Sequence, residues 1–164
     1  MSARARNPGR KYARPRGVTA RNPRVLARRP KAAGALVCAD CGLYQQAGRW
    51  QCGKPPLAAL RAGRCPACER VRQRYPAGTL RLPVEFLRHR TEVLRLIRNV
   101  ARAEAAEHPL ERLMEAEESD GHLVVTTTGV HLARAIAGRL ARRFHRRPRL
   151  RYADGEALLH VTWE

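Results

Sequence analysis

Lysine is scarce in this strongly basic chain, and long apolar runs are missing altogether. The 164 residues include 33 Lys and Arg against 14 Asp and Glu, for a formal charge of +19, yet the lysines are only Lys11, Lys31 and Lys54. The planar guanidinium of arginine fits phosphate oxygens and stacks on bases, which the ammonium of lysine does less well. The charge therefore favours an anionic partner, although composition alone does not separate RNA from DNA or from an anionic membrane surface.

Three further absences exclude classes of protein. No run of about 18 apolar residues is present, so we expect no membrane-spanning helix and no membrane partner. The basic N-terminus is not followed by an apolar stretch, so we expect no secretory signal and a cytoplasmic location. Glycine-rich loops of the P-loop or dinucleotide-binding type are also missing, and we expect no small-molecule substrate.

The basic residues are unevenly distributed along the chain. Residues 1–35 hold 11 basic and no acidic residues, residues 36–108 hold 13 and 6, and residues 109–164 hold 9 and 8. Residues 1–34 also contain too few bulky apolar side chains to offset the entropy of ordering. We therefore predict a disordered arginine-rich tail over residues 1–34 that folds on RNA. A passive solubilising tail is the alternative.

The cysteines form the most specific motif of the chain. The two CxxC pairs are Cys38-Ala-Asp-Cys41 and Cys65-Pro-Ala-Cys68. Such a pair of pairs supplies the four sulfur ligands of a closed tetrahedral site, and Gly42 permits the tight turn of a zinc knuckle. We predict one structural Zn²⁺ in a zinc-ribbon or treble-clef module over residues 35–80, although the spacing leaves an iron–sulfur cluster open. Disulfides are not expected without export, and Cys52 is predicted to be a free or buried thiol.

A site made of four thiolates has no open position for water, so we expect it to stabilise the fold and not to catalyse a reaction. Such a site would hold nearby RNA-binding groups in place. The predicted groups on the intervening hairpin and around the second CxxC pair are Arg49, Trp50, Arg61, Arg64, Arg70, Arg72 and Arg74. An aromatic ring among arginines can stack on an unpaired base. Plain packing over the metal site is the alternative for Trp50.

A single long helix is predicted to connect the module to the rest of the chain, over residues 81–108. Pro83 suits the first turn of a helix, and the helical pattern continues to Glu107. The apolar face of this helix consists of Val84, Leu87, Leu94, Ile97 and Ala101. Arg88, Arg95 and Arg102 recur every seven residues on another face. We interpret these arginines as an RNA-binding stripe, and an ordinary solvated face is the alternative.

Residues 109–164 are predicted to form a compact ββαββ unit, which makes the chain a member of the α+β class. Two hairpins with Asp-Gly turn signals bracket a helix over residues 129–145. Thr127 or Thr128 is the expected N-terminal cap of that helix. The end of the helix carries more arginines than its dipole requires. We predict phosphate contacts there by Arg142, Arg143, Arg146 and Arg147.

Two constellations could indicate an enzyme. One is a cluster of acidic residues at Glu111, Glu115, Glu117, Glu118 and Asp120. Paired carboxylates can hold magnesium in a nuclease, but alternation on a solvated strand or pairing with the arginines is the simpler interpretation. The other is His131, near the start of the predicted helix, for which spacing specifies no Ser, Cys or carboxylate partner. We therefore expect no catalytic residue.

Several short segments together carry a resemblance to a known family. They are the two CxxC pairs, Gly48-Arg49-Trp50, Tyr75-Pro76-Ala77-Gly78, His108-Pro109-Leu110-Glu111-Arg112 and the stretch 117–137, which includes Thr126-Thr127-Thr128 and His131-Leu132-Ala133-Arg134. Over residues 38–164 the chain resembles small bacterial zinc-ribbon proteins related to the archaeal and eukaryotic nonsense-mediated-decay protein, the large-subunit export adaptor. The resemblance implies docking on the large ribosomal subunit, in quality control, maturation or stability. The adaptor family has eight cysteines for two zinc sites, whereas this chain has 5, enough for one.

Together these features predict a zinc-binding and RNA-binding protein that associates with the ribosome. Ribosomal RNA is the expected partner, with ribosomal proteins as further contacts. A DNA-binding regulator using the same knuckle is one alternative, although no dimerisation heptad or recognition helix stands out. A protein-adaptor module, whose arginines only add solubility, is another.

Overall fold

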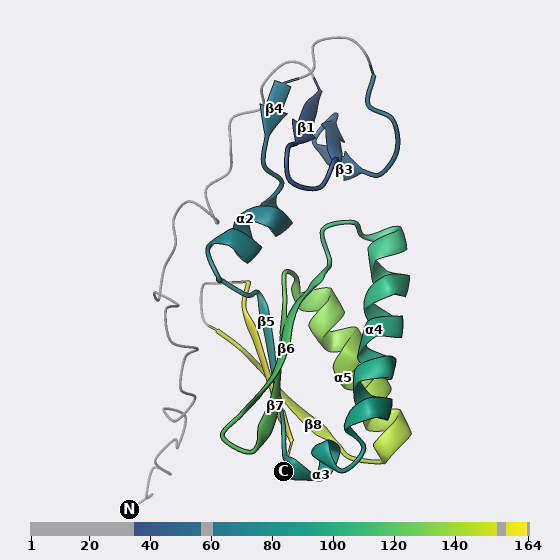
Figure 1. Ribbon diagram of the computed structural model, residues 1–164, viewed down its shortest axis with the longest axis vertical. Coiled ribbons are helices and arrows are strands. Elements are labelled where there is room, and N and C mark those ends of the chain that lie inside the picture. Colours follow the sequence, from purple (N-terminus) through teal and green to yellow (C-terminus); the bar gives the residue numbers. More distant parts are fainter. Residues whose placement is uncertain (1–34, 57–60, 154–156, 164) are drawn as a thin grey trace, which may run out of the picture.

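A computed structural model of the chain describes residues 35–56, 61–153 and 157–163, which form two sheets and four α-helices. The tail predicted over residues 1–34 lies outside the described residues. Figure 1 shows the small sheet above the larger one, with α2 between them and with α4 and α5 on one face of the larger sheet. The chain therefore has the predicted α+β class. None of the described helices is long and apolar enough to cross a membrane.

The small sheet belongs to a unit that we call the cysteine module, residues 35–56 and 61–72. Its elements are β1 (Leu36–Cys38), β2 (Tyr44–Gln46), β3 (Arg49–Gln51), β4 (Arg61–Gly63) and α2 (Pro66–Arg72). The strands lie in the order β3-β2-β1-β4, with β4 parallel to β1 and the other pairs antiparallel. Each strand has only 3 residues. So small a sheet buries little apolar surface, and a metal staple would stabilise it.

The larger sheet is the centre of a second unit, which we call the α+β unit, residues 75–153 and 157–163. Its elements are β5 (Gly78–Leu82), α3 (Val84–Leu87), α4 (Arg90–Glu107), β6 (Leu113–Ser119), β7 (His122–Thr127), α5 (Val130–Phe144), β8 (Pro148–Tyr152) and β9 (Leu159–Trp163). The strand order is β6-β7-β5-β9-β8. β5 is antiparallel to β7 and parallel to β9.

The position of β5 differs from the sequence-based division of the chain. The last section does contain the strand-strand-helix-strand-strand succession that was predicted for it. Its sheet is nevertheless completed by β5. The sequence predicts these residues to be the end of the zinc-binding module and the start of the connecting helix. Leu80 of β5 pairs with Val125 on one side and with Val161 on the other. The middle of the sheet therefore comes from a segment upstream of both long helices.

The core lies between this sheet and its two long helices. β5 and β9 bury every second residue, as expected for strands with one covered face. The fully buried side chains that meet there include Leu80, Leu82, Val93, Ile97, Leu123, Val125, Leu132, Ile136, Leu140, Leu159 and Val161. Burial of each such side chain contributes about 1.5–3 kcal/mol relative to exposure. The cysteines form a separate small cluster, so the α+β unit has a core of its own.

The predicted connecting helix is broken into two. α3 ends at Leu87 and α4 begins at Arg90, and His89 between them has φ −115° and ψ 28°, outside the helical range. Pro83 is the N-cap of α3, so it precedes the first turn. Because Arg88 comes before α4, the predicted stripe of three arginines is interrupted, and only its second and third members lie on one helix.

The break allows Phe86 to enter the core. The Phe86 ring lies 5.2 Å from the ring of Phe144 and 5.4 Å from that of Trp163, in edge-to-face geometry. Val84, which was predicted to be on the buried face, is 54% exposed. Packing of one aromatic side chain thus overrides the helical periodicity that the sequence suggested.

The start of α5 also differs from the prediction. Its N-cap is Gly129, and neither Thr127 nor Thr128 caps it with a side chain. The Thr127 hydroxyl instead donates to the carbonyl of Gly129 at 2.7 Å. A carboxylate oxygen of Glu111 accepts a hydrogen bond from the backbone N–H of Leu132 at 2.9 Å. An acidic side chain from outside the helix therefore compensates the positive end of the α5 dipole.

Candidate metal centre

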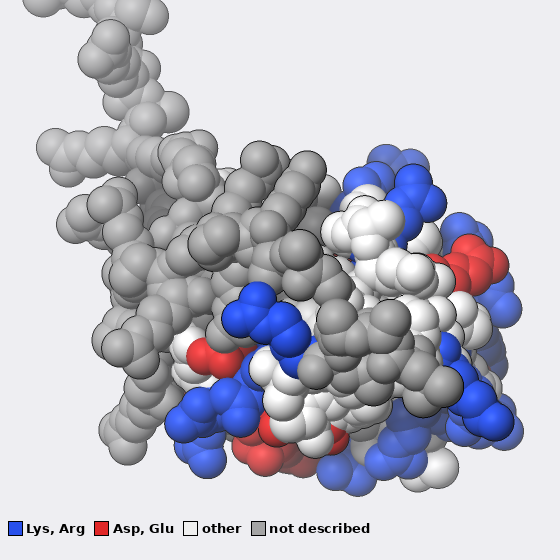
Figure 2. Space-filling model, turned by 90° about the horizontal axis from the view of Figure 1, so that it is seen from above, with Lys and Arg blue, Asp and Glu red and all other residues white. Residues whose placement is uncertain are grey.

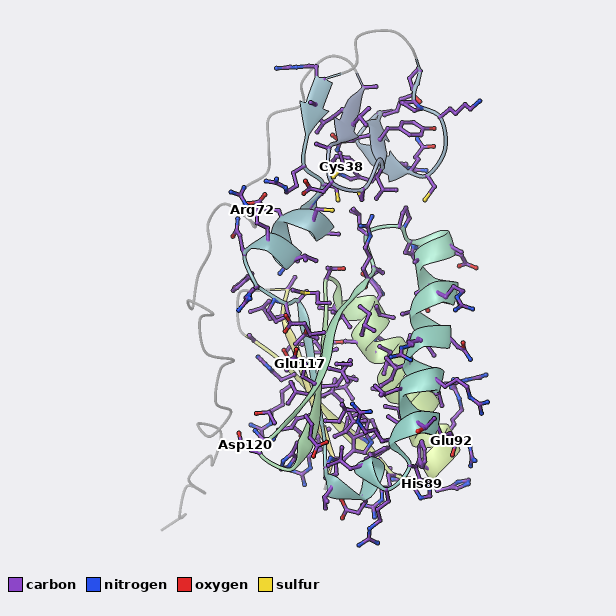
Figure 3. The ribbon with its side chains drawn as sticks, in the orientation of Figure 1. Cys38, Arg72, His89, Glu92, Glu117 and Asp120 are labelled. Atoms are coloured by element: carbon purple, nitrogen blue, oxygen red, sulfur yellow. The ribbon has the colours of Figure 1, made fainter. Side chains whose placement is uncertain are left out.

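Four cysteine side chains converge on the side of the cysteine module that faces the α+β unit (Figure 3). The Sγ atoms of Cys38, Cys41, Cys65 and Cys68 all lie within 4.8 Å of one another. The Sγ atoms of Cys41 and Cys65 are 3.7 Å apart. A tetrahedral zinc with bonds of about 2.3 Å spaces its sulfur ligands by about 3.8 Å, whereas a disulfide needs about 2.05 Å. The sulfurs therefore fit one tetrahedral metal ion, as the CxxC spacing predicted.

Local backbone hydrogen bonds hold these sulfur atoms in place. Gly42, at φ 73°, makes the knuckle turn, and its N–H donates to the carbonyl of Cys38 at 2.9 Å. The N–H of Cys65 donates to the Sγ of Cys38 at 3.3 Å. The N–H of Cys68, in the first turn of α2, donates to the Sγ of Cys65 at 3.4 Å. Such N–H donors stabilise the thiolate form, which is the form that binds a metal.

The pKa values of the thiols differ among these cysteines. Burial acts to raise the pKa of Cys38, but backbone N–H donors from Cys65 and Asp40 lower it to about 6. Burial raises the pKa of Cys65 to about 11, and burial together with the neighbouring thiols also raises the pKa of Cys68. One thiolate is therefore favoured, while four adjacent thiolates require a compensating positive charge, which a bound metal supplies.

Arg112 supplies a further positive charge from the α+β unit. Its Nη2 donates to the Sγ of Cys41 at 3.2 Å, and its Nη1 lies 3.6 Å from the Sγ of Cys68. Its Nε donates to the carbonyl of Pro109 at 3.0 Å. Burial acts to lower the pKa of the guanidinium, but contact with Cys41 and the charges of the other sulfurs raise it. Arg112 is therefore a charged bridge between the two units.

The segment around Arg112 attaches to both units. Leu110 packs against the small cysteine cluster that contains Leu43. Glu111 caps α5 through the N–H of Leu132. The backbone N–H of Arg112 donates to the hydroxyl of Thr128 at 2.8 Å. Sequence reasoning missed this role because Arg112 lies 71 residues from Cys41 along the chain.

Two of the arginines that were predicted to bind RNA around the second CxxC pair are engaged within the protein. Arg64 forms ion pairs with Asp40 and, at 3.5 Å, with Glu69. Arg70 donates to the carbonyl of Tyr75 at 3.1 Å, and its guanidinium lies 5.5 Å from the centre of the Tyr75 ring. Both side chains therefore stabilise the module around α2.

The other predicted residues of the module differ in exposure. Trp50 is half-buried and packs against the cysteine cluster, as in the alternative interpretation of this residue. Cys52 is exposed and lies outside the group of four sulfur atoms. Figure 3 shows Arg72 on the side of the molecule opposite α4. Exposed arginines are Arg49, Arg61 and Arg72 in the module and Arg74 just after it.

A second group of arginines covers the outer side of the helices. On α4, Arg95, Arg98 and Arg102 are exposed and follow the i, i+3, i+7 spacing that places side chains on one face. That face points away from the buried Val93 and Ile97. The fold thus keeps Arg95 and Arg102 together on one face, and Arg98 lies on the same face.

α5 packs beside α4 and extends this surface. Arg142 and Arg143 are exposed near its end, and Arg143 pairs with Glu92 of α4 at 2.6 Å. Arg146, just after α5, is half-buried and pairs with Glu85 at 3.8 Å. Exposed arginines on or next to the two helices are Arg88, Arg90, Arg95, Arg98, Arg102, Arg134, Arg139, Arg142, Arg143 and Arg147. In Figure 2, blue Lys and Arg side chains lie on several sides of the described surface, and red patches are fewer.

Among the described residues, the acidic cluster and His131 do not form a metal-binding group. In the part of the chain that the structure describes, the four cysteines are the only group of at least three His, Cys, Asp or Glu that could hold a metal. Glu111 is used at α5, whereas Glu117 lies on β6 and Asp120 at the tip of the β6–β7 hairpin (Figure 3). The ring of His131 stacks on that of His108, with centroids 6.4 Å apart.

Comparisons with family models, with curated proteins and with solved structures give no match to this chain. The resemblance to the bacterial zinc-ribbon proteins therefore stays a prediction from the sequence.

Proposed function

We propose that this protein is a non-catalytic zinc protein that binds structured RNA, and that its target is ribosomal RNA. One observation carries the proposal: from Val130 to Ala153, across α5 and β8, the chain contains 8 arginines and no acidic residue. The phosphates of an RNA supply the negative charge that complements such a surface. The choice of the ribosome rests on the resemblance described from the sequence.

The proposed metal is zinc, held by Cys38, Cys41, Cys65 and Cys68. Four thiolates complete its coordination and leave no position for water or substrate, so the ion is structural. When bound, the ion keeps the sulfurs deprotonated and fixes the knuckle against α2. A doubly charged cation leaves part of the negative charge of four thiolates uncompensated, and Arg112 lies where it offsets that remainder.

The proposed role of the metal in RNA binding is to keep the arginine surfaces in a fixed relation. The cysteine module contributes exposed Arg49 and Arg61, and the helices contribute Arg95, Arg98 and Arg102. Contacts of the module with Leu110 and Arg112 hold the two sets together. Phosphate contacts set position and affinity, so the binding energy would come mainly from these arginines.

The first test measures RNA affinity as a function of salt. Purified protein is titrated into a labelled ribosomal RNA hairpin, and we expect a steep fall in affinity between low and moderate salt. A variant with Arg95, Arg98 and Arg102 all changed to glutamine should bind more weakly and show a shallower salt slope, by about one per lost phosphate contact. Glu107→Gln, an exposed change on the same helix, is the matched control and should bind at least as tightly.

The second test separates the target from other polyanions. We expect ribosomal RNA to compete better than duplex DNA, and the protein to sediment with large ribosomal subunits on a sucrose gradient of cell extract. We also expect one zinc per chain by metal analysis. RNA affinity that does not respond to salt would contradict the proposed RNA binding. Equal competition by duplex DNA would favour the alternative of a DNA-binding regulator. Protein that is folded but free of metal would contradict the assignment of zinc.

A further inference from the structure

Strand β8 leaves two large apolar side chains in solvent. Leu150 is 41% exposed and Tyr152 is 55% exposed. Both stand on the helix-covered face of the sheet, because they pair with Val161 and Leu159, which are buried there. Among the described strands β8 is the last of its sheet and pairs only with β9. The two side chains are exposed because the helices do not cover this edge of the sheet. We call the edge strand β8, together with the adjoining side of α5, the margin.

The placement of α5 explains this margin. A Cβ atom on Gly78 of β5 would lie 2.4 Å from the Cβ of Ala133, so α5 lies directly over the middle strand. Tyr152 is in register with Leu159, which is in register with Gly78. Two strand spacings separate β8 from β5, a distance of about 10 Å. Tyr152 thus lies beside the N-terminal half of α5, level with Ala133.

Arginine is the charged residue on β8 and next to it on α5, while the acidic residues Asp154 and Glu156 follow β8 in the sequence, outside the described residues. Arg149 and Arg151 are exposed on β8 and alternate with the two apolar side chains. They occupy the opposite face of the sheet, in register with Thr162 and His160. The neighbouring helix carries Arg134, and no acidic residue occurs from residue 130 to residue 153. The exposed ring of Tyr152 therefore lies on an edge strand whose opposite face carries two arginines, and the neighbouring helix carries an exposed arginine.

A strand or protein partner fits this margin poorly. Pro148 begins β8, and two arginines follow at alternate positions. Proline and charged side chains are means by which proteins keep an edge strand from pairing with another strand. Two apolar side chains also make a much smaller patch than a stable protein interface buries. An unpaired nucleotide suits the same residues, because its base offers a flat ring and its phosphates offer negative charge.

We propose that the margin formed by β8 and α5 binds an unpaired segment of RNA, with a base stacked on Tyr152 and flanking phosphates on Arg151 and Arg134. The inference rests on the proposed RNA binding and deepens it by naming the kind of RNA. The preferred target is a structured RNA that carries a single-stranded extension. The double-stranded part contacts the arginines of the helices, and the extension crosses the edge of the sheet.

The test compares two RNAs with one protein. One RNA is a blunt hairpin, and the other is the same hairpin with a short unpaired extension that contains 2-aminopurine. Wild-type protein should bind the extended hairpin more tightly and quench the 2-aminopurine fluorescence. Tyr152→Ala should lose about 5- to 150-fold in affinity for the extended hairpin and little for the blunt one, since stacking is worth about 1–3 kcal/mol per base.

Three further variants sharpen the comparison. Tyr152→Phe keeps the ring and should retain both quenching and preference. Tyr152→Leu keeps apolar bulk without a ring and should lose the quenching, which gives a result even if truncation to alanine disturbs β8. Val84→Ala removes an equally exposed apolar side chain, 54% exposed on α3, and should leave the affinity for both RNAs unchanged.

The outcomes distinguish this inference from the proposed function. Wild-type protein that binds neither hairpin would overturn RNA binding altogether. Equal affinity for the two hairpins, with Tyr152→Ala indistinguishable from wild type, would overturn only the assignment of this margin. Thermal unfolding by circular dichroism shows that each variant is folded before its affinity is interpreted.

Discussion

Replacing Arg112 with alanine removes the guanidinium that joins the α+β unit to the cysteine site. The change deletes the donors to the Sγ atoms of Cys41 and Cys68, at 3.2 and 3.6 Å, and the donor to Pro109. It leaves the backbone of the segment in place, because the N–H of Thr128 still donates to the carbonyl of residue 112 at 2.9 Å. The expected effect is therefore confined to the thiolates and to the contact between the units.

The size of the effect follows from the role of groups that contact metal ligands. Removal of such a group typically lowers metal affinity by about 10- to 100-fold, which corresponds to about 1.4–2.7 kcal/mol. A hydrogen bond to a charged group contributes about 1.5–3 kcal/mol. The bond to Cys41 is the shorter of the two, so we expect it to account for most of the loss. Arg112→Lys keeps the charge but not the planar fork, and we expect an intermediate affinity.

Competition with a chromophoric chelator measures the zinc affinity of each variant. We expect Arg112→Ala to release zinc at a correspondingly lower chelator concentration than the wild-type protein. Arg49→Ala removes the same charge from an exposed position on β3 and serves as the control. The reasoning is refuted if Arg112→Ala binds zinc as tightly as wild type, or if the two variants lose affinity equally.

Three further predictions concern the metal, α5 and the fifth cysteine. Chelation should unfold the cysteine module but not the α+β unit, because each has its own buried cluster. Trp50 fluorescence should then shift to the red while Trp163 fluorescence stays unchanged. The variant Trp50→Phe shows the emission of Trp163 alone and so separates the two signals. Gly129→Ala should lower the free energy of unfolding by about 1 kcal/mol, because the added Cβ would lie 2.0 Å from a Glu111 carboxylate oxygen and displace it from α5. Urea denaturation with an unchanged midpoint would contradict this. Cys52→Ser should leave the zinc content unchanged, since Cys52 is outside the four-sulfur group, and a lower content by metal analysis would identify it as a ligand.

The features that the sequence predicts well are local ones. A CxxC pair places two sulfurs close together whatever the rest of the fold does, and Gly42 takes the positive φ that the knuckle turn needs. α5 follows the apolar periodicity of its sequence, and Ala133, Ile136 and Leu140 are buried. The β6–β7 hairpin turns at Asp120 and Gly121, both at positive φ. In each case the signal lies within a few residues of the structure that it specifies.

The features that the sequence does not reveal depend on distant partners. Leu80 and Leu82 alternate with polar residues as a strand should, but the partners of Leu80, Val125 and Val161, lie 45 and 81 residues further along the chain. No glycine or proline marks the break at His89, because the cause is the packing of Phe86 against Phe144. Nothing in the sequence distinguishes Arg112 from the other arginines, because its contact with the cysteine sulfurs depends on the fold.

The central place of β5 determines how the chain can be divided. A fragment that begins after residue 82 would keep both long helices but would deprive β7 and β9 of the strand lying between them, leaving unpaired backbone groups inside a divided sheet. A fragment that ends at residue 73 would keep every sulfur but lose Leu110 and Arg112. A cut between α2 and β5 leaves each described sheet whole in its own piece. The affinity of the two pieces for one another, measured in solution with zinc, would report directly how strong the contacts between the units are.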